Sequence, residues 1–192
     1  MQPVGASLRV MGGGLLPSTD PRPTEAAMKS RLGATLLLLI GLLAAAPAHG
    51  VGQSAPWCRN ADLKASYRYS DSGAGHVWGW IVLRNRSTHA CRTGGFGGIS
   101  YVGGGDGTRI GAPADRTGTP ATYLVRPGQR VRSLLQETRA ASYPAGRCRP
   151  HAVDGFRIYV PGAVRSQFVA HPTTGCLDTD VHLLTHQPYR RP

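Results

Sequence analysis

Methionine, acidic residues and long apolar runs are all scarce in this chain of 192 residues. The methionines are Met1, Met11 and Met28, so residues 51–192 contain none, which excludes a copper site with an axial methionine there. Ten acidic residues leave few of the paired carboxylates that glycosidases use. The apolar run 32–46 is shorter than the roughly 20 residues that a membrane-spanning helix needs.

Signals for long helices are missing as well. The chain contains 26 glycines and 15 prolines, which favour short elements joined by turns. Only 17% of the residues are charged, compared with about a quarter in an average globular protein. This composition excludes coiled coils and helical bundles. The frequent apolar segments exclude a disordered polar chain.

The segment 28–50 has the features of a secretory signal peptide. Lys29 and Arg31 precede the apolar run, and small residues typical of a signal-peptidase site follow it. Cleavage is predicted after either Ala48 or Gly50, and an uncleaved membrane anchor is the alternative. No cysteine directly follows the run, so a lipoprotein is not expected. The protein is therefore expected to be secreted or otherwise extracytoplasmic, with no membrane-spanning segment after cleavage.

The signal peptide divides the chain into four parts. Met28 lies directly before the basic residues and suits the start of translation better than Met1, so residues 1–27 are interpreted as a non-native or disordered extension. Residues 51–57 form a short linker. Residues 58–190 are long enough to bury one adequate core and are predicted to form a single domain.

The exported part of the chain is strongly basic. Residues 51–192 keep 18 of the 22 Lys and Arg residues and 8 of the 10 acidic residues, and Lys64 is their only lysine. One interpretation is the arginine preference of a GC-rich genome, and the other is attraction to anionic surfaces outside the membrane. The second makes anionic cell-envelope polymers, or an envelope protein, the expected partners. Nucleic acid is a poor partner for an exported chain, despite a pI of about 10.4.

The exported part also holds all four cysteines: Cys58, Cys91, Cys148 and Cys176. Disulfides are expected in an oxidising compartment, and four cysteines allow three pairings. Residues that pair across an antiparallel hairpin have a constant index sum, so a disulfide across a hairpin has its midpoint in the turn. The first two cysteines have their midpoint in the turn signal 72–75, and the last two in the turn signal 160–163. The predicted pairs are Cys58–Cys91 and Cys148–Cys176, and Cys91–Cys148 is the alternative.

Short apolar and alternating segments between turn signals predict strands along the whole exported part. These segments are 63–69, 76–85, 98–102, 108–111, 123–125, 129–138, 156–160, 164–170 and 181–184. In the second segment Trp78 and Trp80 share one side, while Ile81 and Leu83 share the other, which is typical of a central strand. The predicted fold is an all-β, antiparallel β-sandwich, immunoglobulin-like in general architecture, with two disulfides.

Several residues in this framework are candidates for binding. Three arginines near the first disulfide form a possible anion-binding patch: Arg84, Arg86 and Arg92. A solvated surface that keeps the protein soluble is the alternative interpretation. No catalytic residues, metal ligands or cofactors are predicted, because the cysteines are paired and no zinc spacing or phosphate loop is present.

The order of the motifs resembles a known family. The motifs are Cys58, Gly-Ala-Gly-His at 73–76, Leu-Arg-Asn-Arg-Ser at 83–87, Cys-Arg-Thr-Gly-Gly-Phe at 91–96, Arg-Pro-Gly at 126–128, Cys148 and Cys176. This arrangement resembles the domain of unknown function 4232 family, which is found in secreted proteins and lipoproteins of high-GC Gram-positive bacteria. The resemblance implies an exported two-disulfide β-sandwich and supplies no catalytic residues. The chain departs from the family at Gly97, where proline is common, and lacks the lipid-attachment cysteine of many members.

The function expected from these observations is that of a secreted, non-enzymatic binding or interaction module at the cell envelope. Two alternatives remain. One is a carbohydrate-binding module that uses an exposed Trp57, Trp78 or Trp80. The other is a hydrolase whose site is assembled from distant residues such as His151 and Asp154. An exposed aromatic platform favours the first alternative, and a deep polar cleft with perturbed titrating groups favours the second.

Overall fold

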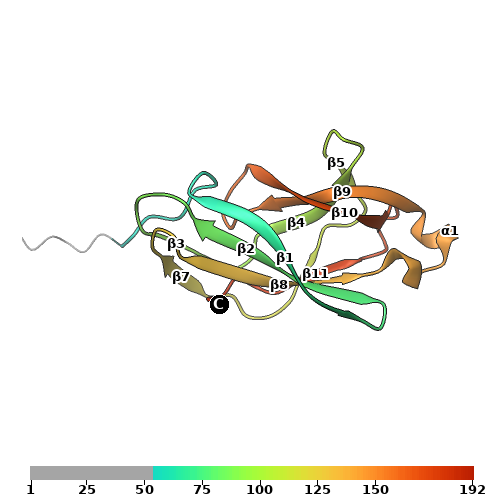
Figure 1. Ribbon diagram of the computed structural model, residues 1–192, viewed down its shortest axis with the longest axis horizontal. Helices are drawn as coiled ribbons and strands as arrows, with labels where there is room; N and C mark the ends of the chain where they lie inside the picture. The colour runs from blue at the N-terminus through green and yellow to red at the C-terminus, as the bar shows by residue number, and fades with distance from the viewer. Residues whose placement is uncertain (1–53) are drawn as a thin grey trace, which may run out of the picture. The chain divides into compact units, whose positions relative to one another are not determined.

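The computed structural model describes residues 54–192, whose regular secondary structure is almost entirely β-strand (Figure 1). The predicted signal peptide 28–50 and the predicted extension 1–27 lie outside the described residues, as do residues 51–53 of the predicted linker. The strands are β1 (Leu63–Gly73), β2 (His76–Asn85), β3 (Cys91–Gly94), β4 (Gly98–Gly103), β5 (Thr108–Ile110), β6 (Asp115–Arg116), β7 (Thr122–Val125), β8 (Arg130–Thr138), β9 (Pro150–Tyr159), β10 (Ser166–Cys176) and β11 (Leu184–His186). A 3₁₀ turn (Ala140–Ser142) and the one-turn α1 (Ala145–Cys148) separate β8 from β9. None of the helices among residues 54–192 is long and apolar enough to span a membrane.

The strands form three sheets (Figure 1). A five-stranded sheet has the order β1-β2-β8-β11-β6, a four-stranded sheet has the order β10-β9-β4-β5, and β3 pairs with β7. Every pairing is antiparallel except that of β11 with β6. The all-β sandwich expected from the sequence is therefore confirmed.

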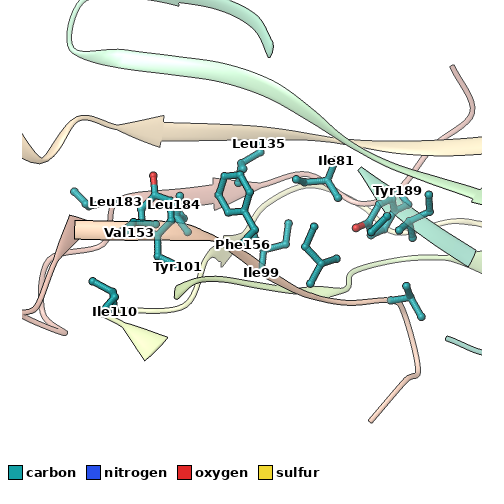
Figure 2. Packing of buried hydrophobic residues seen from close by; sticks show 14 of the residues in the cluster. Ile81, Ile99, Tyr101, Ile110, Leu135, Val153, Phe156, Leu183, Leu184 and Tyr189 are labelled. Atoms are coloured by element: carbon teal, nitrogen blue, oxygen red, sulfur yellow. The ribbon is translucent and has the colours of Figure 1, made fainter. Parts of the chain in front are cut away.

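The core lies between the inner faces of the two larger sheets (Figure 2). Ile81 and Leu135 project from the five-stranded sheet, and Phe156 and Ile99 from the four-stranded sheet. Each of these side chains is almost completely buried, and burying one side chain of this size contributes about 1.5–3 kcal/mol. The core therefore fixes which face of each strand points outward.

Both predicted disulfides are present. Cys58 is bonded to Cys91 and Cys148 to Cys176. The midpoint prediction is correct because the residue numbers of paired positions have a nearly constant sum in both hairpins. In the β1–β2 hairpin this pairing runs from the turn to Leu63↔Asn85. In the β9–β10 hairpin it runs from the turn to Pro150↔Cys176. Each disulfide thus closes the open end of a hairpin.

The predicted strand positions were inaccurate near the C-terminus. The last strand is β11, Leu184–His186, rather than 181–184. Val181 and Leu183 are buried in the core although they are not in a strand, and their apolar character produced the strand signal. The short strands β3 and β6 were not predicted, because their four and two residues give no clear alternation.

Candidate functional site: the basic outer face of the five-stranded sheet

The outer face of the five-stranded sheet carries rows of aligned basic side chains. On β1, Leu63 and Ala65 point into the core, so Lys64 and Arg68 point outward. Lys64 lies opposite Arg84 of β2, which in turn lies opposite Arg130 of β8. All three cations of this row are exposed. Three neighbouring strands therefore place three positive charges side by side.

A row of like charges opposes the pairing of the strands that carry it. Like charges directly opposite each other on neighbouring strands are destabilising. No Lys or Arg among residues 54–192 has a carboxylate oxygen within 4.0 Å, since the ion pairs there all involve histidines: His89–Asp62, His171–Glu137 and His182–Asp115. The positive charge of the outer face is thus not neutralised within the described part of the chain.

Trp80 adds an aromatic surface next to this row. It lies opposite Arg68 of β1, and the guanidinium groups of two other arginines lie over its ring. The Cζ atoms of Arg132 and Arg190 lie 4.2 Å and 5.4 Å from the ring centroid. The two arginines are also joined by backbone hydrogen bonds in both directions, which hold them side by side. Cation–π contacts of this kind keep long arginine side chains in place on an open surface.

Trp78 continues the aromatic surface toward the β1–β2 turn. Its Nε1 donates to Oε1 of Gln136 at 3.2 Å, and the ring of His76 packs against it at 5.7 Å between centroids. Trp78 and Trp80 are both half-buried rather than hidden in the core. The outer face therefore combines two ordered indole rings with six cations: Lys64, Arg68, Arg84, Arg130, Arg132 and Arg190.

The three arginines singled out in the sequence have different surroundings. Arg84 is exposed within the basic row, and Arg86 is exposed just beyond the end of β2. Arg92 is half-buried on β3, where its Nε donates to the carbonyl of Ala55 at 2.7 Å and its guanidinium lies 5.3 Å from the centroid of the Trp57 ring. The partners of Arg84 in the folded sheet are Lys64 and Arg130, which the sequence did not bring together with it.

The structure also shows where the residues considered for the two alternative functions lie. Trp57 is 54% exposed and lines a pocket of about 480 Å³ together with Phe96. Asp154 accepts a hydrogen bond from the backbone N of Gly105 at 2.8 Å and so supports the β4–β5 turn, while His151 is exposed on β9. Among residues 54–192 no group of three or more His, Cys, Asp or Glu side chains is placed to hold a metal ion.

A buried polar cluster on the inner face was not expected from the sequence. Glu137 of β8 is 4% exposed and accepts hydrogen bonds from Tyr67 at 3.0 Å and Tyr101 at 2.6 Å. Its Oε2 also lies 2.9 Å from Nε2 of His171, whose ring stacks on Phe156. Burial, reinforced by the Glu137 carboxylate, raises the pKa of both tyrosines far above the usual range. The cavity beside the cluster measures only about 90 Å³, so the cluster connects the two sheets rather than offering a ligand site.

His186 is a second buried polar group. It is 1% exposed, its Nδ1 lies 3.1 Å from both the carbonyl of Gln187 and Oγ of Ser133, and its ring meets the Phe96 ring edge-on. Burial, with a smaller contribution from the positive charge of Arg116, lowers the pKa of His186 to about 4. The native protein therefore holds this imidazole in its neutral form.

The depressed pKa of His186 predicts a loss of stability on acidification. Above pH 6.5 the side chain is neutral in both states; between pH 6.5 and 4 only the unfolded chain takes up the proton, so the free energy of unfolding falls by about 3 kcal/mol. The free energy of unfolding, measured with urea at pH 7.0 and at pH 4.5, should fall less on acidification in His186→Gln than in the unaltered protein. The matched change His151→Gln, at an exposed histidine without a carboxylate oxygen within 4.0 Å among residues 54–192, should keep the full loss. Equal losses in all three proteins would refute the prediction.

These features define a small all-β domain with two disulfides and an unneutralised basic outer face. The chain belongs to the family described as domain of unknown function (DUF4232), whose sequence model matches residues 58–190. The resemblance seen in the sequence is thereby confirmed. No curated protein and no solved structure matches the chain.

Proposed function

We propose that the protein is an exported, non-enzymatic module that binds anionic polymers of the cell envelope on the outer face of its five-stranded sheet. The observation that carries the proposal is the row Lys64–Arg84–Arg130, three exposed cations on adjacent strands with no carboxylate partner among residues 54–192. Such a row reduces the stability of the sheet unless an anion neutralises it. An extended anionic polymer can neutralise all three charges at once.

The rest of the face supports the same partner. The guanidinium groups of Arg132 and Arg190 lie over the ring of Trp80, so they are held in position before a ligand arrives. Preorganised side chains lose less conformational entropy on binding. The two disulfides suit an oxidising compartment outside the cytoplasm, where such polymers are found.

The proposal predicts a large loss of polymer binding when the face is neutralised. In Lys64→Gln/Arg68→Gln/Arg84→Gln, all three side chains are exposed, so the fold should be retained. A basic side chain at an anionic surface contributes about 1 kcal/mol, so the dissociation constant for poly(glycerol phosphate) should rise about hundredfold. Isothermal titration calorimetry in low salt measures this change.

The matched control removes the same charge elsewhere. Arg109→Gln/Arg147→Gln/Arg165→Gln alters three exposed arginines on β5, on α1 and in the β9–β10 turn. This variant should bind the polymer within about threefold of the unaltered protein. An equal loss in both variants would show that net charge alone attracts the polymer, contrary to the proposal. Equal binding of a neutral glycan would instead favour the carbohydrate-binding alternative at Trp57.

A further inference from the structure

A pocket at one end of the basic face has three arginines among its lining residues. Its volume is about 440 Å³, and its lining includes Arg126, Arg130 and Arg191. All three side chains are exposed, and none has a carboxylate oxygen within 4.0 Å among residues 54–192. The pocket thus gathers three positive charges around a space large enough for a small anionic group and the atoms attached to it.

The backbone under the pocket is held rigidly by a turn. Arg126 to Gln129 form a type II turn, with Pro127 at its second position and Gly128 at its third, where φ is +80°. Gln129 N donates to the carbonyl of Arg126 at 3.0 Å, and Arg126 N donates to Oε1 of Gln129 at 2.9 Å. Two of the pocket's arginines therefore extend from a fixed loop and the strand that follows it.

Asn85 fixes this turn from the buried side. Its backbone N donates to the carbonyl of Gln129 at 2.9 Å, and its carbonyl accepts from Gly128 N at 2.8 Å. Its fully buried side-chain amide donates to the carbonyls of Val125 and His89, both at 2.9 Å. Hydrogen bonds consequently fix the loop under the pocket, so the loop does not need to change its conformation when a ligand binds.

The third arginine, Arg191, is positioned by the C-terminal segment, in which successive side chains point to opposite sides. Arg190 stacks on Trp80 of the basic face, while the next residue, Arg191, lies over the ring of Tyr123 at 5.7 Å and donates to the carbonyl of Leu124 at 3.4 Å. Within residues 54–192, one of the five N–H donors of Arg191 is used in this way. Arg130 belongs to both the row and the pocket, so the two are continuous.

We propose that this pocket binds a phosphate group. Arginine binds carboxylates and phosphates through paired hydrogen bonds, but three unneutralised guanidinium groups match a phosphate better than a carboxylate. A phosphate monoester carries about −1.5 to −2 charges at pH 7 and offers three acceptor oxygens, whereas a carboxylate carries a single charge and two oxygens. The inference rests on the proposed function only for the source of the phosphate, which would be a terminal phosphate monoester of the envelope polymer, because each phosphodiester within such a polymer carries a single charge.

The test is a titration with inorganic phosphate at constant ionic strength, followed by the backbone amide NMR signals of Gly128 and Gln129. These signals should shift and saturate, and acetate should need at least tenfold higher concentration for the same shift. Arg126→Gln/Arg191→Gln should weaken phosphate binding at least tenfold, because each charge-assisted hydrogen bond is worth a large fraction of the affinity. Arg109→Gln/Arg147→Gln should leave it unchanged.

The outcomes separate this inference from the proposed function. Phosphate shifts of similar size at amides throughout the chain, or an equal loss in both double variants, would overturn the pocket even if the polymer still binds the outer face. Conversely, saturable phosphate binding that survives Lys64→Gln/Arg68→Gln/Arg84→Gln would uphold the pocket even if that variant shows no loss of polymer binding. The two ideas can therefore fail independently, because the two sets of variants share no residue.

Discussion

A variant in which alanine replaces all four cysteines is expected to be unfolded at 25 °C. The two disulfides close separate loops of 33 and 28 residues. In the chain-entropy model each such loop contributes about 3.5 kcal/mol by restricting the unfolded chain, and the contributions add because the loops do not overlap. A combined loss of about 7 kcal/mol is comparable with the whole stability of a typical domain, about 5–15 kcal/mol.

The single-disulfide variants serve as the comparison. Cys58→Ala/Cys91→Ala and Cys148→Ala/Cys176→Ala should each remain folded, with the free energy of unfolding reduced by about 3.5 kcal/mol. Urea unfolding followed by tryptophan fluorescence and far-ultraviolet circular dichroism measures all three. If the variant without cysteines unfolds within 2 kcal/mol of the unaltered protein, the hydrophobic core alone holds the two sheets together and the entropic account is wrong.

Glu137→Leu should be the most destabilising single substitution at a polar residue of the core. It leaves the hydroxyls of Tyr67 and Tyr101 and the Nε2 of His171 without their common acceptor. Removing one partner from a buried charged cluster costs about 3–5 kcal/mol, because the remaining groups stay desolvated. The urea midpoint should fall accordingly.

A second substitution distinguishes unpaired polar groups from a simple packing defect. Tyr101→Phe added to Glu137→Leu removes one orphaned hydroxyl and should recover about 1–2 kcal/mol, although Tyr101→Phe alone should not stabilise the protein. A double variant less stable than Glu137→Leu would mean that shape, and not hydrogen bonding, dominates at this position. If Glu137→Leu cost less than 1 kcal/mol, the cluster would have no structural role.

Local patterns in the sequence predicted the hairpins well. The midpoint between Cys58 and Cys91 fell in the β1–β2 turn, because antiparallel pairing keeps the index sum constant over the whole hairpin. Alternation in β2 separated the inward Ile81 and Leu83 from the outward Trp78 and Trp80. Both signals need only one or two consecutive strands, so the sequence alone determines them.

Features that depend on the pairing or packing of distant strands could not be predicted from local sequence patterns. The partners of Glu137 come from β1, β4 and β10, far from β8 in the sequence. One local signal was nonetheless available, because Val131, Ser133, Leu135 and Glu137 alternate along β8 and all are buried. A carboxylate at the inward position of an apolar strand signals a buried polar network.

The basic row on the outer face also depends on distant strands and could not be predicted from local sequence patterns. Arg84 was singled out together with Arg86 and Arg92 because the three are close in sequence. Its cross-strand neighbours are Lys64 and Arg130 instead, and the second of these depends on the pairing of β2 with β8, which are separated by five other strands in the chain. The assignment of a charged face therefore required the sheet order.

The salt dependence of polymer binding tests the central claim most directly. The logarithm of the association constant for poly(glycerol phosphate) is measured against the logarithm of the sodium chloride concentration. Each cation that contacts a flexible polyanion contributes about 0.7 to the slope, so Lys64→Gln/Arg68→Gln/Arg84→Gln should reduce the magnitude of the slope by about 2. The control Arg109→Gln/Arg147→Gln/Arg165→Gln should keep the slope of the unaltered protein. Identical slopes for all three proteins would contradict the account, because the outer face of the five-stranded sheet would then make no contact with the polymer.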